Sequence, residues 1–266
     1  MDRMERMQKI LQTGMAAGGL ENNGQDPEFQ KITQRFLYGD VAHHVTLSDA
    51  QRALIVLVAL TTCQTWPAIE KYTQAALAAE AAPEEIKEAL IQCTPYIGME
   101  KVQCALEEVN RVFEAKGIQL PLADQATVTE QTRLEKGLEV QRRIFGKENI
   151  DAMRAFAPEE LKHIQAYLSA YCFGDFYTRK TLDLKMRELI TFCAICCLGG
   201  CEAQAKAHAA GNVSVGNTRD TGDHAMPTFH WIPSRAQCHC LYRSGYPAIN
   251  TEEYKKRCLC RVSLFF

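Results

Sequence analysis

The sequence predicts an all-α fold built from two similar helical units. Apolar residues recur at helical spacing almost throughout from Pro27, and no strand-like alternation extends beyond four or five residues. The chain also repeats itself at a separation of 135 positions. With 266 residues and 47% hydrophobic residues, it has enough apolar material for a core.

The repeat sets the expected domain organisation. A shift of 135 positions places residues 52–55 (RALI) on 187–190 (RELI), and no gap is needed from Gly39 to Glu85. The same shift pairs the Gly-Asp of 39–40 with that of 174–175. The expected units are an N-terminal arm (1–26), a first repeat (27–117), a linker (118–134), a second repeat with the candidate site (135–220) and an irregular segment (221–266).

Local signals predict where the helices of the first unit begin. Ser48 precedes a long apolar run and has Gln51 three residues later, which is the pattern of a capping box. Pro83 is followed by two glutamates, and both residue types suit the first turn of a helix. Helices are therefore expected over residues 27–39, 49–63, 83–97 and 101–116.

The second unit contains an apolar helix, a Gly199-Gly200 break and another helix that opens with Cys201. A helix N-terminus stabilises a thiolate and lowers the pKa of a cysteine. His208 lies two turns later on the same face, and Glu188 lies on the preceding helix. The three side chains form a candidate nucleophile with an acid/base pair.

Plainer readings of the same residues stay open. Cys201 can be an inert thiol, Glu188 can pair with Arg187 or Lys185, and His208 can be a surface residue. The first unit has Ala53, Trp66 and Thr73 at the corresponding positions, so it lacks all three reactive groups. If one unit is active, it is the second.

Composition and charge exclude several classes of protein. The net charge of −2 gives no reason to expect nucleic acid, and no run of eighteen apolar residues predicts a membrane span. The N-terminus lacks the pattern of a signal peptide, so a cytoplasmic location is expected. Several of the twelve cysteines lie in apolar helical runs and are expected to be buried hydrophobic residues: Cys63, Cys93, Cys104, Cys193 and Cys196.

The helical pattern is lost after Asp220. A one-base shift in the reading of residues 221–239 permits codons that restore a helix, which suggests a frameshift, an altered splice or a gene-model error. The alternative is a real, irregular C-terminal tail. Cysteines and a histidine in residues 238–240 and 258–260 resemble zinc ligands, but their spacing is not a standard one, and we expect no metal and no cofactor.

The chain resembles the carboxymuconolactone decarboxylase family, which includes alkylhydroperoxidase D. The resemblance rests on FGDFYTRKTLDLKMRELI and CLGGCEAQAKAHAAGNVSVGNT in the second unit and on LYGD, TLSDAQRALI and TPYIG in the first. It implies an all-helical protein that assembles as a homotrimer or a higher homo-oligomer, and a pseudo-sixfold trimer for a tandem member.

The resemblance also implies two alternative activities. In the peroxidase branch, Glu188, Cys201 and His208 match a motif in which C-x-x-C carries two thiols, but the second thiol is replaced by Gln204. Cys197 is a possible substitute as resolving thiol.

In the decarboxylase branch, His208 and Glu188 would act as acid and base on a small carboxylated lactone. Arg179, Arg187 or Lys206 would hold the substrate carboxylate. We therefore expect a cofactor-free enzyme acting on a peroxide or a small organic acid. The alternative, from another class, is a non-catalytic oligomeric helical protein.

Overall fold

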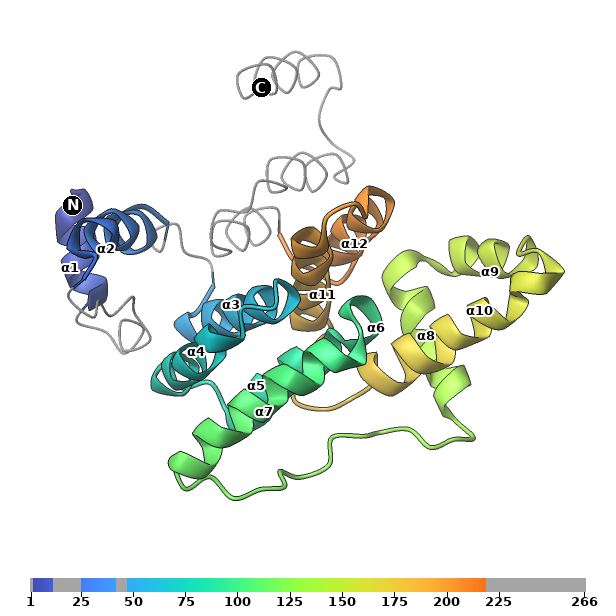
Figure 1. Cartoon of the computed structure of the whole chain (residues 1–266). Helices are drawn as coiled ribbons and strands as arrows, with labels where there is room; N and C mark the ends of the chain where they lie inside the picture. Colours follow the sequence, from blue (N-terminus) through green and yellow to red (C-terminus); the bar gives the residue numbers. More distant parts are fainter. Residues whose placement is uncertain (1, 12–24, 42–46, 219–266) are drawn as a thin grey trace, which may run out of the picture.

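The computed structural model describes residues 2–11, 25–41 and 47–218, and every regular element within these ranges is helical (Figure 1). The expected all-α fold is therefore confirmed. The irregular segment 221–266, with its frameshift hypothesis and its cysteine clusters, lies outside the described residues. None of the helices in the described ranges has the length and apolar character needed to cross a membrane.

The first half of the chain contains α1 (Arg3–Leu11), α2 (Pro27–Gln34), the π-helical stretch η2 (Arg35–Val41), α3 (Asp49–Thr62), α4 (Trp66–Ala78), α5 (Pro83–Gln92), α6 (Thr94–Ile97) and α7 (Met99–Ala115). The second half contains α8 (Arg133–Phe145), α9 (Lys147–Ala155), the short 3₁₀ turn η3 (Glu159–Leu161), α10 (Lys162–Tyr167), the π-helical stretch η4 (Leu168–Tyr177), α11 (Leu184–Leu198) and α12 (Glu202–Ser214).

The duplication is visible in the helix boundaries. The start of α11 lies 135 positions after that of α3, and the same shift carries the start of α2 onto that of α10. It also places α4 on α12 within one residue at each end. The chain is thus a tandem of two helical units, as the sequence repeat predicts.

Side-chain caps explain why several helices begin where they do. The Ser48 hydroxyl accepts a hydrogen bond from the Gln51 main-chain N–H at 3.2 Å, and the Gln51 side-chain Oε1 accepts one from the Ser48 main-chain N–H at 3.0 Å. This is the capping box that the sequence predicts. The Asp183 carboxylate accepts the Met186 N–H at 2.8 Å at the start of α11. The caps fix the residues at which the two central helices, α3 and α11, begin.

The larger of the two hydrophobic clusters in the described residues is shared by both units. The core contains the apolar residues of α3 and α11, among them Ile55, Leu57, Ile190 and Phe192, which have no exposed surface. Burying side chains of this size contributes about 1.5–3 kcal/mol each to folding before entropic costs. The two units therefore form a single folded body around α3 and α11.

Helix α1 packs on η2 in the way that α8 packs on η4. The Arg3 guanidinium binds Asp40 at 2.8 Å, and Arg133 binds Asp175 at the repeat-equivalent position. The backbones approach closely, since a Cβ on Gly174 would lie 2.3 Å from the Arg133 carbonyl oxygen. The helix that the sequence assigns to an N-terminal arm thus has a counterpart in α8.

Candidate functional site

The candidate site lies where α11 turns back into α12. Gly199 and Gly200 both adopt positive φ angles, of 70° and 68°, which favour glycine over residues with a Cβ. The turn lets α12 pack along α11, so that residues separated by about twenty positions face each other. Cys201 directly precedes α12 and is partly buried.

Glu188 and His208 form a buried pair across the two helices. The His208 Nδ1 lies 2.9 Å from the Glu188 Oε2. Glu188 has no exposed surface, whereas the His208 side chain is 10% exposed, so the imidazole is the member of the pair that solvent reaches. Asn212 donates from its Nδ2 to the Glu188 main-chain oxygen at 3.1 Å, which ties α12 to α11 beside the pair.

Tyr177, in η4, is hydrogen-bonded to the second carboxylate oxygen of Glu188. Its hydroxyl donates to the Glu188 Oε1 at 2.7 Å and also lies 2.9 Å from the Thr191 Oγ1. Burial, together with the nearby Glu188 charge, raises the pKa of Tyr177 far above its ordinary value. Tyr177 therefore stays neutral and acts as a hydrogen-bond donor that orients the carboxylate.

Tyr96 brings the first unit into the site. It belongs to α6, its hydroxyl lies 3.2 Å from that of Tyr177, and its ring meets the His208 ring edge-on at 5.5 Å. The Cys172 Sγ donates to the Tyr96 hydroxyl at 3.3 Å, and burial raises the pKa of Cys172 to about 12. A continuous chain of hydrogen bonds thus leads from His208 into the interior.

Tyr96 and Tyr177 were not predicted from the sequence as members of the site. Tyr96 was noted in the sequence only within the TPYIG segment, and Tyr177 lies in a π-helical stretch whose side-chain directions do not follow ordinary helical spacing. The aromatic wall beside His208 also includes Phe145 from α8, with ring centroids 5.3 Å apart. These neighbours come from three different elements, so no local pattern reveals them.

The two cysteines singled out from the sequence lie at opposite sides of the glycine turn. Cys197 is in the last turn of α11 and Cys201 directly precedes α12. Both are partly buried thiols packed against the main core. Their roles as nucleophile and resolving thiol stay predictions.

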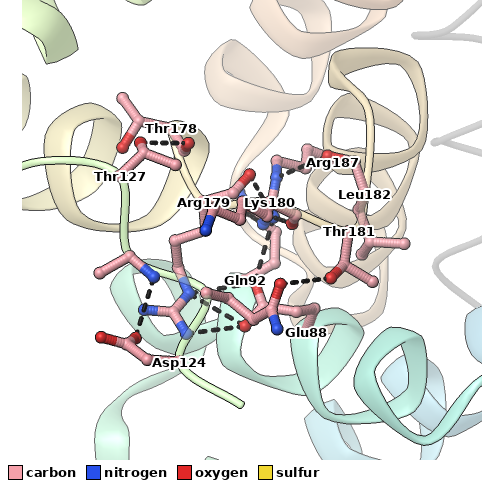
Figure 2. Close-up of polar contacts among 12 residues, drawn as sticks. Glu88, Gln92, Asp124, Thr127, Thr178, Arg179, Lys180, Thr181, Leu182 and Arg187 are labelled. Atoms are coloured by element: carbon pink, nitrogen blue, oxygen red, sulfur yellow. Dashed lines mark hydrogen bonds and ion pairs between the residues drawn. The ribbon is translucent and has the colours of Figure 1, made fainter.

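Two of the three cations considered for a substrate carboxylate are bound inside the protein (Figure 2). The Arg179 guanidinium donates to both carboxylate oxygens of Glu88, at 2.8–3.0 Å, and the Arg187 Nη2 lies 3.1 Å from the same carboxylate. Glu88 comes from α5 in the first unit, so the cluster joins the two units. Lys206 is exposed on α12.

Arg187 is fully buried, and each of its three guanidinium nitrogens donates at least one hydrogen bond within the protein. Its Nη1 binds the Gln92 Oε1 at 2.9 Å, its Nε binds the Leu182 oxygen at 3.2 Å, and its Nη2 also reaches the main-chain oxygens of Arg179 and Lys180. Burial lowers the pKa of Arg187, and the neighbouring Glu88 charge offsets only part of that effect. The arginine therefore holds the segment before α11 in place.

Within residues 2–11, 25–41 and 47–218, no cluster of three or more histidine, cysteine or acidic residues is placed to hold a metal ion. The described site offers instead one carboxylate, one imidazole and neutral hydroxyl groups. A carboxylate and an imidazole placed together in this way can act in general acid–base catalysis.

Comparison with known proteins identifies a family and similar solved structures. The model of the carboxymuconolactone decarboxylase family matches residues 27–111 and 162–226. The two matched segments begin 135 positions apart, which is the separation of the sequence repeat. The second segment ends within the irregular sequence, about 20 residues earlier than a full repeat of the first segment would end.

No curated protein matches the chain. A solved structure from Burkholderia xenovorans LB400, described as a gamma-carboxymuconolactone decarboxylase subunit, is similar at 16% identity. The match covers 98% of this chain and 99% of that one, with a TM-score of 0.49.

Proposed function

Because this chain belongs to the carboxymuconolactone decarboxylase family, we propose that it is a cofactor-free enzyme that reduces peroxides through Cys201. The observation that carries the proposal is the buried pair of Glu188 and His208, 2.9 Å apart, on the helices that flank Cys201. Such a pair supplies the proton transfer that a thiol peroxidase needs. Substrates are then hydrogen peroxide or small organic peroxides.

The reaction can be written with these groups alone. The Cys201 thiolate attacks the distal peroxide oxygen, the O–O bond breaks, and Cys201 becomes a sulfenic acid. The leaving alkoxide takes a proton from His208, whose Nδ1 faces Glu188. Glu188 stabilises the charged imidazole, and Tyr177 holds the second carboxylate oxygen in place. An external dithiol returns the sulfenic acid to the thiol: its first thiol forms a mixed disulfide with Cys201 as water leaves, and its second thiol releases Cys201 and closes the external disulfide. Alternatively, Cys197 forms the disulfide with Cys201, and the external dithiol then reduces it.

Decarboxylation of a small carboxylated lactone is the second candidate, and one observation favours it. Gln204 stands where a dithiol peroxidase would have its resolving cysteine. Against it, Arg179 and Arg187 are both bound to Glu88, which leaves exposed Lys206 as the cation for a substrate carboxylate. The peroxidase reading depends on none of these cations and is therefore preferred.

Peroxide consumption in the presence of an external dithiol tests the proposal. In a Cys63→Ser background, which removes another exposed thiol that could react with peroxide, Cys201→Ser and His208→Gln are both expected to abolish turnover, whereas Cys104→Ser, at an exposed thiol on α7, is the matched control and keeps it. Turnover that survives Cys201→Ser would refute the thiol mechanism. Lactone decarboxylation that is lost in His208→Gln but kept in Cys201→Ser would support the second candidate. Inactivity of the wild type and of every variant in both assays would support the non-catalytic alternative.

Assembly into a ring of identical chains is part of the proposal. Phe29 and Ile32 are exposed on α2, and their repeat equivalents Ile164 and Tyr167 are exposed on α10. Figure 1 shows α2 and α10 at opposite ends of the molecule. Two apolar pairs at opposite ends support head-to-tail contacts, which close into rings such as a homotrimer. Light scattering on the purified chain tests the proposed oligomer. Cell fractionation tests the expected cytoplasmic location.

A further inference from the structure

A second pair of thiols lies outside the proposed site, where the ends of α3 and α11 meet. Cys63 is the C-terminal cap of α3 in the first unit, and Cys197 lies in the last turn of α11 in the second unit. The two thiols are hydrogen-bonded to each other, although 134 positions separate them in the chain. Cys63 is exposed and Cys197 is partly buried, and neither is in a disulfide.

The surroundings of this thiol pair favour a thiolate. The hydrogen bond from Cys197 is the main cause that lowers the pKa of Cys63 to about 7, and the positive charge of Lys101 on α7 adds to it. Partial burial acts in the opposite direction but is weaker. About half of Cys63 is then thiolate at neutral pH, which is the reactive form of cysteine.

We propose that Cys63 and Cys197 are a second oxidisable site, a dithiol across the two units that closes to a disulfide with small peroxides. Three observations carry this inference: the direct contact of the thiols, the exposure of Cys63 to solvent, and the neighbouring lysine charge. The inference requires no role for Cys201, Glu188 or His208, so it stands apart from the proposed function.

The chemistry balances with the peroxide as the only oxidant. The Cys63 thiolate attacks one peroxide oxygen, the O–O bond breaks, and the leaving hydroxide or alkoxide is protonated from solvent. Cys197 then attacks the Cys63 sulfenic acid, the S–O bond breaks, and water leaves with the thiol proton of Cys197. The two cysteines lose two electrons in total, and the peroxide gains them.

This pairing changes the partner of Cys197. The sequence offers Cys197 as a resolving thiol for Cys201, because the two are four residues apart. In the structure, Gly199 and Gly200 separate those two cysteines, whereas the Cys197 thiol is hydrogen-bonded to the Cys63 thiol.

The test is oxidation of the reduced full-length chain with one equivalent of hydrogen peroxide. Free thiols are then alkylated, the intact mass is measured, and the peptides are mapped without reduction. The wild type, Cys201→Ser and the control Cys104→Ser are expected to lose the mass of two hydrogens and to yield a Cys63–Cys197 peptide. In Cys63→Ser and Cys197→Ser that peptide cannot form, and the remaining cysteine of the pair is expected to be recovered as an alkylated free thiol.

The alternative results are also informative. A Cys197–Cys201 peptide in the wild type, or no disulfide at all, would overturn the inference. So would an unchanged yield of linked Cys197 in Cys63→Ser. Circular dichroism of Cys63→Ser and Cys63→Ala checks that the exposed position tolerates replacement. If Cys201→Ser loses peroxidase turnover in the Cys63→Ser background, and Cys201→Ser alone keeps the Cys63–Cys197 bridge, both proposals hold. If turnover never depends on Cys201 and the bridge still forms, only the proposed function fails.

Discussion

Replacing Glu88 with alanine would leave two arginine side chains without the carboxylate that they share. The Glu88 side chain is 2% exposed, Arg187 is 0% exposed, and Arg179 is 20% exposed. Removing one partner of a buried ion pair costs about 3–5 kcal/mol, because the other charge stays buried and unpaired. The mutation therefore tests whether this cluster holds the two units together.

The structure places the expected cost of Glu88→Ala near the lower end of that range. The Arg187 Nη2 retains the main-chain oxygens of Arg179 and Lys180, and the Arg179 guanidinium can turn toward water. We therefore expect a loss of about 3 kcal/mol in the free energy of unfolding. For a chain of this size, that loss lowers Tm by about 6–12 °C.

Thermal unfolding followed by circular dichroism measures the effect. Glu139→Ala is the matched control, because its carboxylate pairs with Lys136 on the surface and both side chains are more than half exposed. We expect no measurable shift in Tm for that control. Adding Arg187→Met to Glu88→Ala should restore part of the loss, since the buried charge is then removed. Equal Tm values for Glu88→Ala and Glu139→Ala would refute the reasoning.

Three further predictions concern the candidate site and the thiol pair. Gly211→Ala places a Cβ 2.7 Å from the Glu188 Oε2, so calorimetry should show a loss of about 1–3 kcal/mol. Tyr177→Phe removes a donor to Glu188, so kcat should fall about tenfold or more with KM nearly unchanged. Alkylation of Cys63 should rise with pH around a midpoint of about 7, and Cys197→Ala should move that midpoint toward 9.0 by removing the hydrogen bond.

Local signals in the sequence were sufficient for much of the fold. Ser48 with Gln51 marks the start of α3, Pro83 begins α5, and Gly199-Gly200 separates α11 from α12. Each signal acts through the backbone within a few residues, so it can be read without knowledge of the tertiary structure. The repeat then supplied the relation between the two units.

The site was predictable only where its members share two adjacent helices. Glu188 and His208 meet because α11 and α12 pack side by side after a short turn. Tyr96 meets Tyr177 across 81 positions, and no spacing rule connects a tyrosine in one unit to a π-helical stretch in the other. Contacts of this kind depend on the packing of whole helices.

Burial of Arg187 and its pairing with Glu88 were not visible in the sequence, which offered this arginine as a ligand for a substrate carboxylate. One signal was nevertheless present. Arginine occurs at the repeat-equivalent positions 52 and 187, whereas the candidate reactive groups occur in the second unit only. Arg52 is also nearly buried, at 7% exposure. A residue common to both units is better explained by packing than by chemistry.

The position of Tyr96 has a consequence for how the gene can change. A duplicated half that has no reactive groups of its own would ordinarily be free to drift, but this half supplies Tyr96 to the neighbourhood of His208. Under the proposed mechanism, selection on His208 in the second unit would therefore also restrain Tyr96 in the first. A chain cut between the two halves would uncover the His208 ring on the side where the Tyr96 ring packs.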